Sequence, residues 1–333
     1  MTTMAAEGSS GARRARPSLV ALPGDGQPGG GPARRRRADP EPGAERAAGK
    51  DAGPDSGAGP DAAAPAGEHG SIDAERLSDV DEWGRSQHLR DILATLYDPI
   101  YEKWFRVEWE GFDKLPREGG ALLVANHAGA IPSDAPSIMH GIERELRRPV
   151  YGLADDMFKR VPVVNLGWSR LGGVQAHPDN AYRLLREQQH LVTVFPEGSK
   201  GPGKLYSERY QLRRFGRGGF VQIAMRAGVP IIPLAIVGSE ETMPILARVP
   251  AVAKLLGVPY VPITANMLLG PLALVPFPAK VRIRVLDPVH LDVPPDQPRY
   301  SRSRIMDASE AIRNAIQHEL YDMLRRRRSV WFG

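Results

Sequence analysis

The sequence predicts an α/β fold in which a mainly parallel central sheet is flanked by helices. Short apolar runs typical of buried strands recur along the chain, and amphipathic segments with apolar residues at every third or fourth position alternate with them. Strands that alternate with helices form parallel sheets covered on both faces. The predicted strands are 106–111, 121–125, 149–154, 173–176, 191–195, 229–238 and 280–287, and the predicted helices are 135–147, 157–172, 180–189 and 305–324.

Residues 1–70 are predicted to be a disordered tail. They consist mostly of Ala, Gly, Pro, Arg, Asp and Glu, with no Ile and no aromatic residue. Such a segment cannot bury enough apolar surface to offset the entropy lost on ordering. Its short apolar run at 18–22 does not suit a signal peptide, which argues against secretion. We therefore expect a single domain at 71–324, followed by a basic-aromatic tail at 325–333.

The composition narrows the chemistry. The chain has no Cys, which excludes disulfides, thiolate metal sites and a cysteine nucleophile. It also lacks the zinc-binding pattern H-E-x-x-H and the nucleophile elbow G-x-S-x-G, so we expect no metal site and no serine hydrolase site. A net charge of +5 and clusters such as Arg34–Arg37 favour an acidic partner surface, either membrane phospholipid or nucleic acid.

Three segments are candidates for contact with a membrane. The first is an amphipathic helix within 71–107, bent near Pro99, whose aromatic residues either pack on the sheet or touch lipid. The second, 255–279, has no charged residue and five prolines, which prevent one continuous membrane-spanning helix. We interpret it as an apolar excursion into one leaflet or along a groove, with a buried crossover as the alternative. The third is 325–333, where Arg325–Arg328 precede Trp331 and Phe332, although a frayed terminus has the same pattern.

Two turns follow predicted strands and carry polar side chains. Asn126 and His127 end the strand 121–125, and Asp134 follows seven positions after His127. Catalytic groups concentrate at the carboxyl ends of parallel strands, where a rigid sheet positions them. The structural alternative is a strand-end histidine, with Asp134 as the N-cap of the next helix. The second turn, FPEGSKG, begins at Phe195 and presents Glu197 and Lys200 at the same predicted edge.

The second turn also satisfies the phosphate-loop pattern G-x4-G-K over residues 198–204. Leu205, however, stands where that loop needs a Ser or Thr hydroxyl for Mg²⁺. Pro202 removes one of the backbone donors that would cradle a phosphate. These two departures argue against a nucleotide-binding loop.

Taken together, NHAGAIPSD, FPEGSK and VPIIPLAIVG resemble, in order and separation, the signature blocks of the glycerolipid acyltransferase superfamily, over roughly residues 85–290. The resemblance implies transfer of an acyl group from acyl-CoA or acyl carrier protein to a lysophospholipid such as 1-acylglycerol-3-phosphate, in phospholipid biosynthesis. It implies no bound cofactor, and a peripheral or monotopic place at the cytoplasmic face of an anionic membrane. His127 would be the general base, oriented by Asp134, and backbone N–H groups near Gly198 would receive the oxyanion. The implied substrate-binding residues are Asn126, Glu197, Gly198, Ser199, Lys200, Lys204 and Arg209.

Two departures from the family pattern bear on the acceptor. Six residues separate His127 from Asp134, as in the branch that includes diacylglycerol-forming and triacylglycerol-forming relatives. Where the family has an Arg that holds the acceptor's phosphate, this chain has His177 and Pro178. A phosphorylated acceptor would then depend on Lys200, Lys204 or Arg209. A monoacylglycerol or diacylglycerol acceptor is the alternative, and a basic membrane-binding or nucleic-acid-binding module without enzymatic activity is the alternative outside the family.

Overall fold

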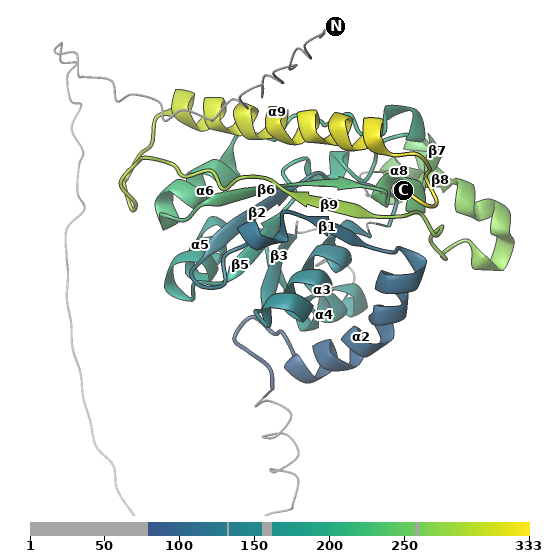
Figure 1. Ribbon diagram of the computed structural model, residues 1–333, viewed down its shortest axis with the longest axis horizontal. Helices are drawn as coiled ribbons and strands as arrows, with labels where there is room; N and C mark the ends of the chain where they lie inside the picture. The colour runs from purple at the N-terminus through teal and green to yellow at the C-terminus, as the bar shows by residue number, and fades with distance from the viewer. Residues whose placement is uncertain (1–78, 132, 155–161, 257–259) are drawn as a thin grey trace, which may run out of the picture.

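The computed structural model describes residues 79–333 except 132, 155–161 and 257–259, and a seven-stranded sheet organises the described part (Figure 1). The strand order is β1-β9-β6-β2-β5-β3-β4, and every neighbouring pair is parallel except β6 and β9. The predicted fold class is therefore confirmed, whereas the tail 1–70 lies outside the described residues. The strands are β1 (Glu108–Glu110), β2 (Ala121–Ala125), β3 (Val150–Ala154), β4 (Gly173–Gln175), β5 (Leu191–Val194), β6 (Ile231–Val237) and β9 (Arg282–Val285).

Helices cover both faces of this sheet, and Figure 1 shows α9 along one face with α2, α3 and α4 on the other. The α helices are α2 (Gln87–Pro99), α3 (Asp134–Leu146), α4 (Pro162–Arg170), α5 (Pro178–Tyr182), α6 (Gly219–Ala227), α7 (Ser239–Thr242), α8 (Pro250–Leu256) and α9 (Arg302–Arg326). Shorter π and 3-10 turns are η1 (Ile100–Trp104), η2 (Phe112–Lys114), η4 (Arg183–Glu187), η5 (Gly198–Lys200), η6 (Tyr206–Glu208) and η7 (Ala265–Leu272). The sequence analysis did not predict α6.

The central strand β2 shows why the predicted strands are apolar throughout. Leu122 and Val124 pack into the core on the side of α6 and α9, whereas Leu123 and Ala125 pack into the core on the side of α3. Successive side chains of a strand point to opposite faces, so a strand buried on both faces has no position left for a polar residue. This continuous apolar run ends at the polar residues Asn126 and His127.

The predicted N-terminal helix is present as α2 followed by the π-helical turn η1, with Pro99 at the junction. Tyr101 and Phe105 are buried, whereas Leu96 and Trp104 remain exposed. Tyr101 and Phe105 therefore pack on the domain, as one interpretation of this segment predicted. Leu96 and Trp104 face outward, where the other interpretation predicts contact with lipid.

The sequence predicts Asp134 and Asp179 as the N-caps of the helices at 135–147 and 180–189, and both predictions are wrong. Ser133, not Asp134, is the N-cap of α3, and Asp134 is the first helical residue. His177, not Asp179, caps α5, and its Nδ1 atom accepts the N–H of Asp179 at 3.3 Å. The helix begins before Asp179 because Pro178 takes the first helical position, where its missing N–H has no cost.

The five prolines of the apolar segment 255–279 predicted that it cannot form one continuous helix, and the structure confirms this. It contributes β8 (Pro262–Thr264), which pairs with β7 (Ile245–Arg248), and then the 3-10 turns of η7. Leu268 is 87% exposed and Leu274 is 76% exposed, so the alternative of a buried crossover is wrong here. No helix in the described part of the chain has the length and apolar character needed to cross a bilayer.

The basic-aromatic tail is folded back onto the domain rather than frayed. The side chain of Arg327 is 6% exposed and forms an ion pair with Glu241 at 3.0 Å. The backbone N–H of Lys280 donates to the carbonyl of Val330 at 3.1 Å, and the guanidinium of Arg106 donates to the carbonyl of Trp331. Arg327 is therefore part of the folded core, whereas Trp331 stays partly exposed.

Candidate active site

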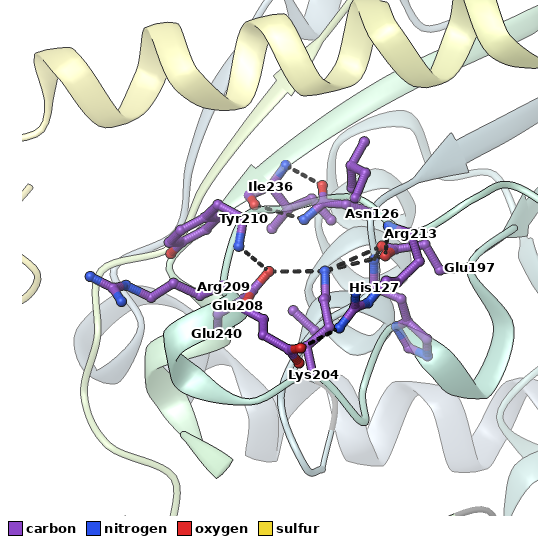
Figure 2. Close-up of polar contacts among 12 residues, drawn as sticks. Asn126, His127, Glu197, Lys204, Glu208, Arg209, Tyr210, Arg213, Ile236 and Glu240 are labelled. Carbon is purple, nitrogen blue, oxygen red and sulfur yellow. Dashed lines mark hydrogen bonds and ion pairs between the residues drawn. The ribbon is translucent and has the colours of Figure 1, made fainter. Parts of the chain in front are cut away.

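The polar residues that follow β2, β5 and β6 meet at one edge of the sheet (Figure 2). These three strands are parallel neighbours, so their carboxyl ends lie together, as the sequence predicted for the first two. Asn126 links two of them, because its side chain donates to the carbonyl of Ile236 at 3.0 Å and accepts the N–H of Ile236 at 2.8 Å. Asn126 is buried and its side-chain amide is paired with the backbone of Ile236, and its role in substrate binding stays a prediction.

His127 and Asp134 are in direct contact. Nδ1 of His127 lies 2.9 Å from Oδ2 of Asp134, and the exposed fractions of the two side chains are 17% and 0%. The carboxylate of Asp134 also accepts the N–H groups of Ala128 at 3.0 Å and Ala135 at 2.7 Å. With the Nδ1 proton held by Asp134, the neutral imidazole has its free lone pair on Nε2. Nε2 has no hydrogen-bond partner among the described residues, so it is free to accept a proton from a substrate.

The six-residue loop between the pair is closed by a glycine. Gly129 has a φ of +83°, and a Cβ atom there would lie 3.0 Å from the carbonyl oxygen of Ser239. A residue with a side chain would be strained in this left-handed conformation and crowded against α7. The Ser133 hydroxyl lies 3.3 Å from the Thr242 hydroxyl, which holds the end of the loop on the same helix. The longer loop therefore still returns Asp134 to His127.

The second turn packs directly on His127. The ring of Phe195 stacks on the imidazole with a centroid separation of 4.1 Å and an interplanar angle of 21°. A Cβ atom at Gly201 would lie 2.8 Å from Cβ of His127, so only glycine permits this approach. The two turns thus hold the imidazole plane between them.

Glu197 and Lys204 are buried and are paired with other protein groups. Oε1 of Glu197 accepts the N–H of His127 at 3.1 Å, and Oε2 accepts the N–H of Arg213 at 2.8 Å. Lys204 lies between two carboxylates, with Nζ 3.3 Å from Glu197 and 3.2 Å from Glu240 (Figure 2). Protein partners thus occupy the carboxylate oxygens and the ammonium, and the roles of Glu197 and Lys204 as substrate contacts stay predictions.

The remaining predicted binding residues lie nearer the surface. Gly198 is exposed, but its N–H donates to the carbonyl of Phe195 at 2.9 Å, so it is not a free oxyanion donor. Ser199 lies in the same turn, η5, and its side chain is outside the described atoms. Lys200 is exposed, and Arg209 is exposed with its guanidinium 4.3 Å from the centroid of the Tyr206 ring. Lys200 and Arg209 remain the reachable cations of the three that were predicted.

Sequence reasoning missed Glu240, Tyr210 and Tyr260. Glu240 and Glu241 follow closely after the buried strand β6. Two acidic residues at this position are a sequence signal for a buried charge with a cationic partner, because charged residues are rarely buried unpaired. Burial raises the pKa of Glu240 to about 7, although the charge of Lys204 opposes this rise. Burial, and to a smaller extent the charge of Asp134, raise the pKa of Tyr260 to about 12. Tyr260 is therefore within electrostatic reach of Asp134, which brings the apolar segment close to the site.

Two other histidines, His140 and His190, pack against protein side chains. Nε2 of His140 lies 2.9 Å from Oδ1 of Asp98, and burial lowers the pKa of His140. His190 packs on the ring of Tyr151 at 5.0 Å between centroids. Among the described residues, no group of three or more His, Asp or Glu side chains is arranged to hold a metal ion.

A mainly parallel sheet whose edge presents a histidine paired with a buried aspartate is an arrangement found in enzymes that use an imidazole as general base. Comparison with known proteins identifies the family. Residues 106–237 match the sequence model of the acyltransferase family. An uncharacterized protein of Mycobacterium tuberculosis is 40% identical over 262 residues, which cover 76% of this chain and 72% of that protein. A second uncharacterized protein, from Mycobacterium leprae, is also 40% identical over 262 residues, 70% of its length. The chain therefore belongs to the acyltransferase family, as the resemblance predicted, and it is an acyltransferase enzyme.

Two further similarities are more distant. The bovine protein named DGAT1/2-independent enzyme synthesizing storage lipids is 31% identical over 145 residues, covering 44% of this chain and 42% of that protein. The crystal structure of the 1-acyl-sn-glycerophosphate acyltransferase PlsC from Thermotoga maritima covers 73% of this chain and 84% of its own, with 18% identity and a TM-score of 0.46.

Proposed function

We propose that this enzyme transfers a fatty acyl group from a thioester, acyl-CoA or acyl carrier protein, to a hydroxyl of a glycerolipid. The observation that carries the proposal is the contact of His127 with the buried Asp134, which leaves Nε2 open at the sheet edge. No bound cofactor is needed for this reaction, because the thioester supplies the activated acyl group. The acceptor and the donor are both substrates.

In the proposed reaction, Nε2 of His127 takes the proton of the acceptor hydroxyl as its oxygen attacks the thioester carbonyl. Asp134 stabilises the imidazolium that forms and keeps the ring oriented. The tetrahedral intermediate then collapses, the carbon–sulfur bond breaks, and the imidazolium returns its proton to the departing thiolate. The products are an ester and a free thiol. Since the substrate supplies the nucleophile, no covalent acyl-enzyme forms.

Two acceptors fit the site. A lysophospholipid such as 1-acylglycerol-3-phosphate would place its phosphate against the exposed Lys200 or Arg209, and the enzyme would then serve phospholipid biosynthesis. A monoacylglycerol or diacylglycerol is favoured by the burial of Lys204, which removes one of three predicted phosphate ligands. The name of the bovine relative, which refers to storage lipids, supports the same alternative.

An acceptor panel with one labelled acyl-CoA tests the reaction and distinguishes the acceptors. We expect labelled product with at least one glycerolipid. A kcat/KM at least about tenfold higher for the lysophospholipid than for the neutral acceptors, a difference of about 1.4 kcal/mol in transition-state binding, would indicate a phosphate contact. The reverse order would assign a neutral acceptor. Failure to acylate any acceptor, from either acyl-CoA or acyl carrier protein, would contradict the proposed function.

We also propose that the enzyme works at the cytoplasmic face of a membrane, as a peripheral or monotopic protein. Exposed leucines of the segment 267–275 and of α2 supply apolar surface. Exposed Arg325 and Arg326 lie close in sequence to the exposed Trp331 and Phe332, a combination that suits anionic lipid. Flotation with anionic liposomes at low salt tests this proposal, and indifference to lipid charge would contradict it. DNA binding without lipid activity would favour a nucleic-acid-binding module instead.

A further inference from the structure

Behind His127 lies a charged cluster that consists of Glu197, Lys204 and Glu240, and Figure 2 shows Lys204 between the two carboxylates. Nζ of Lys204 is 3.3 Å from Oε2 of Glu197 and 3.2 Å from Oε1 of Glu240. The exposed fractions of the three side chains are between 0% and 6%. Charges this deeply buried are tolerated only when they are paired and hydrogen-bonded, so the cluster forms one interdependent unit.

Glu197 connects the cluster to the catalytic loop. Its two oxygens accept backbone N–H groups from different segments, that of His127 at 3.1 Å and that of Arg213 at 2.8 Å. The ammonium of Lys204, 3.3 Å from Oε2, fixes the Glu197 carboxyl group in the position where it accepts both N–H groups. Lys204 therefore positions Glu197, and Glu197 holds the main chain of His127.

Lys204 also supports His127 through its own backbone. Its N–H donates to the carbonyl of Gly201 at 3.1 Å, and Gly201 is the residue that packs against the Cβ of His127. Glu240 fixes the other side of the ammonium and is itself held by the N–H of Tyr210 at 2.9 Å. The cluster thus ties together the carboxyl ends of β2, β5 and β6.

We propose that Lys204 is a positioning residue for acyl transfer, which acts through Glu197 on the main chain of His127 and is anchored by Glu240. The inference rests on the proposed function, in which His127 is the general base. Lys204 touches no substrate in this role, so its loss affects turnover for every acceptor alike. A misplacement of a reacting group by about 1 Å costs about 10²-fold in rate, which sets the scale of the expected effect.

The test is Lys204→Met, which removes the charge and keeps the length of the side chain. We expect kcat to fall about 10-fold to 100-fold with both a phosphorylated and a neutral acceptor, with each KM within about threefold of wild type. A selective rise in KM for the phosphorylated acceptor would instead show that Lys204 binds its phosphate, and would overturn the proposal. Lys114→Met is the matched control: it removes a partly exposed ion pair with Asp287 and should leave both constants unchanged.

A double-mutant cycle with Glu197→Gln tests the route of the effect. Because Lys204 acts through Glu197, the double variant Glu197→Gln, Lys204→Met should have a kcat no lower than that of the less active single variant. Losses that multiply would show that the two residues act independently, and would overturn the proposal.

The conservative variant Lys204→Arg keeps the positive charge. We expect it to fold, by circular dichroism, and to retain kcat within about tenfold of wild type. If Lys204→Met does not fold, Lys204→Arg and the double variant carry the test, and a folded but inactive Lys204→Arg overturns the proposal. A wild-type protein that acylates no acceptor refutes the proposed function itself, whereas an active wild type with an unchanged, folded Lys204→Met refutes only the role of Lys204.

Discussion

The charged cluster behind His127 and the apolar segment 267–275 reverse the usual distribution of side chains between core and surface. Lys204 and its two carboxylate partners are almost fully buried, whereas Leu268 and Leu274 are among the most exposed large hydrophobic residues described. Burying charges costs several kcal/mol that pairing must offset, so a fold retains them where their geometry matters. A group of exposed leucines marks a surface that contacts something else. This contrast underlies both proposals, a positioning role for the interior charges and a lipid contact for the exterior leucines.

The largest expected effect is on the residue that the charged cluster positions. His127→Ala should lower turnover by roughly 10²-fold to 10⁴-fold, because it removes the general base, while circular dichroism and the melting temperature stay close to wild type. The turnover is measured as the rate of acylation of the preferred acceptor. His318→Ala, which changes an exposed histidine of α9, is the matched control and should retain full turnover. Near-wild-type transfer by a folded His127→Ala protein would refute the catalytic role.

The second effect is on stability and concerns the other buried cation at this edge. Arg327→Ala should lower the free energy of unfolding by about 3–5 kcal/mol, because it leaves the buried Glu241 without its cationic partner. Urea unfolding measures it. Arg325→Ala changes a 73% exposed arginine in the same basic run and should cost less than about 0.5 kcal/mol. Equal effects of the two substitutions would show that Arg327 is not part of the core.

This difference also changes how the tail is tested for lipid binding. Deletion of 325–333 would remove Arg327 and destabilise the domain together with any lipid contact. Substitution of the exposed Arg325 and Arg326 separates the two effects, because neither side chain is buried.

The third effect is a pH dependence of stability from Glu240. Its pKa rises from 4.5 to about 7 on folding because burial disfavours the charged form. Between these values the unfolded chain has lost a proton that the folded protein retains, so this contribution to the free energy of unfolding falls as pH rises. The fall is up to about 3 kcal/mol between pH 4.5 and pH 7.

The measurement is the difference in unfolding free energy between wild type and Glu240→Gln, taken across this pH range. Wild type should lose stability relative to the variant as pH rises. Glu118→Gln, at an exposed glutamate, should show a constant difference from wild type. A constant difference for Glu240→Gln would mean that Glu240 is ionised throughout the range.

The smallest expected effect on stability is in the apolar segment. Leu268→Ser combined with Leu274→Ser should change the free energy of unfolding by less than about 0.5 kcal/mol per residue, because both side chains are exposed. The same double variant should weaken flotation with anionic liposomes, and Leu166→Ser at an exposed position of α4 is the control. Unchanged flotation would remove these leucines from the proposed membrane contact.

The local pattern of the chain was sufficient to predict the strands of the main sheet, but not the small one. β2 and β6 are apolar at every position because helices cover both of their faces. β7 and β8, in contrast, are only four and three residues long and partly exposed, and β8 begins with Pro262, so neither has a strand pattern of its own. They exist because residues 245–248 pair with residues 262–264, a contact that requires the folded chain.

The sequence by itself determined that His127 and the turn FPEGSKG share one edge of a parallel sheet, because apolar runs place the strand ends and parallel strands align them. The family resemblance added the contact between His127 and Asp134. The tertiary structure alone decided which charged residues serve as scaffold. Glu197 and Lys204 have the sequence pattern of substrate ligands, yet they are buried by Glu240 after β6 and by the loop that carries Tyr210 and Arg213. Burial of a charge depends on partners distant in sequence, and only the assembled fold supplies them.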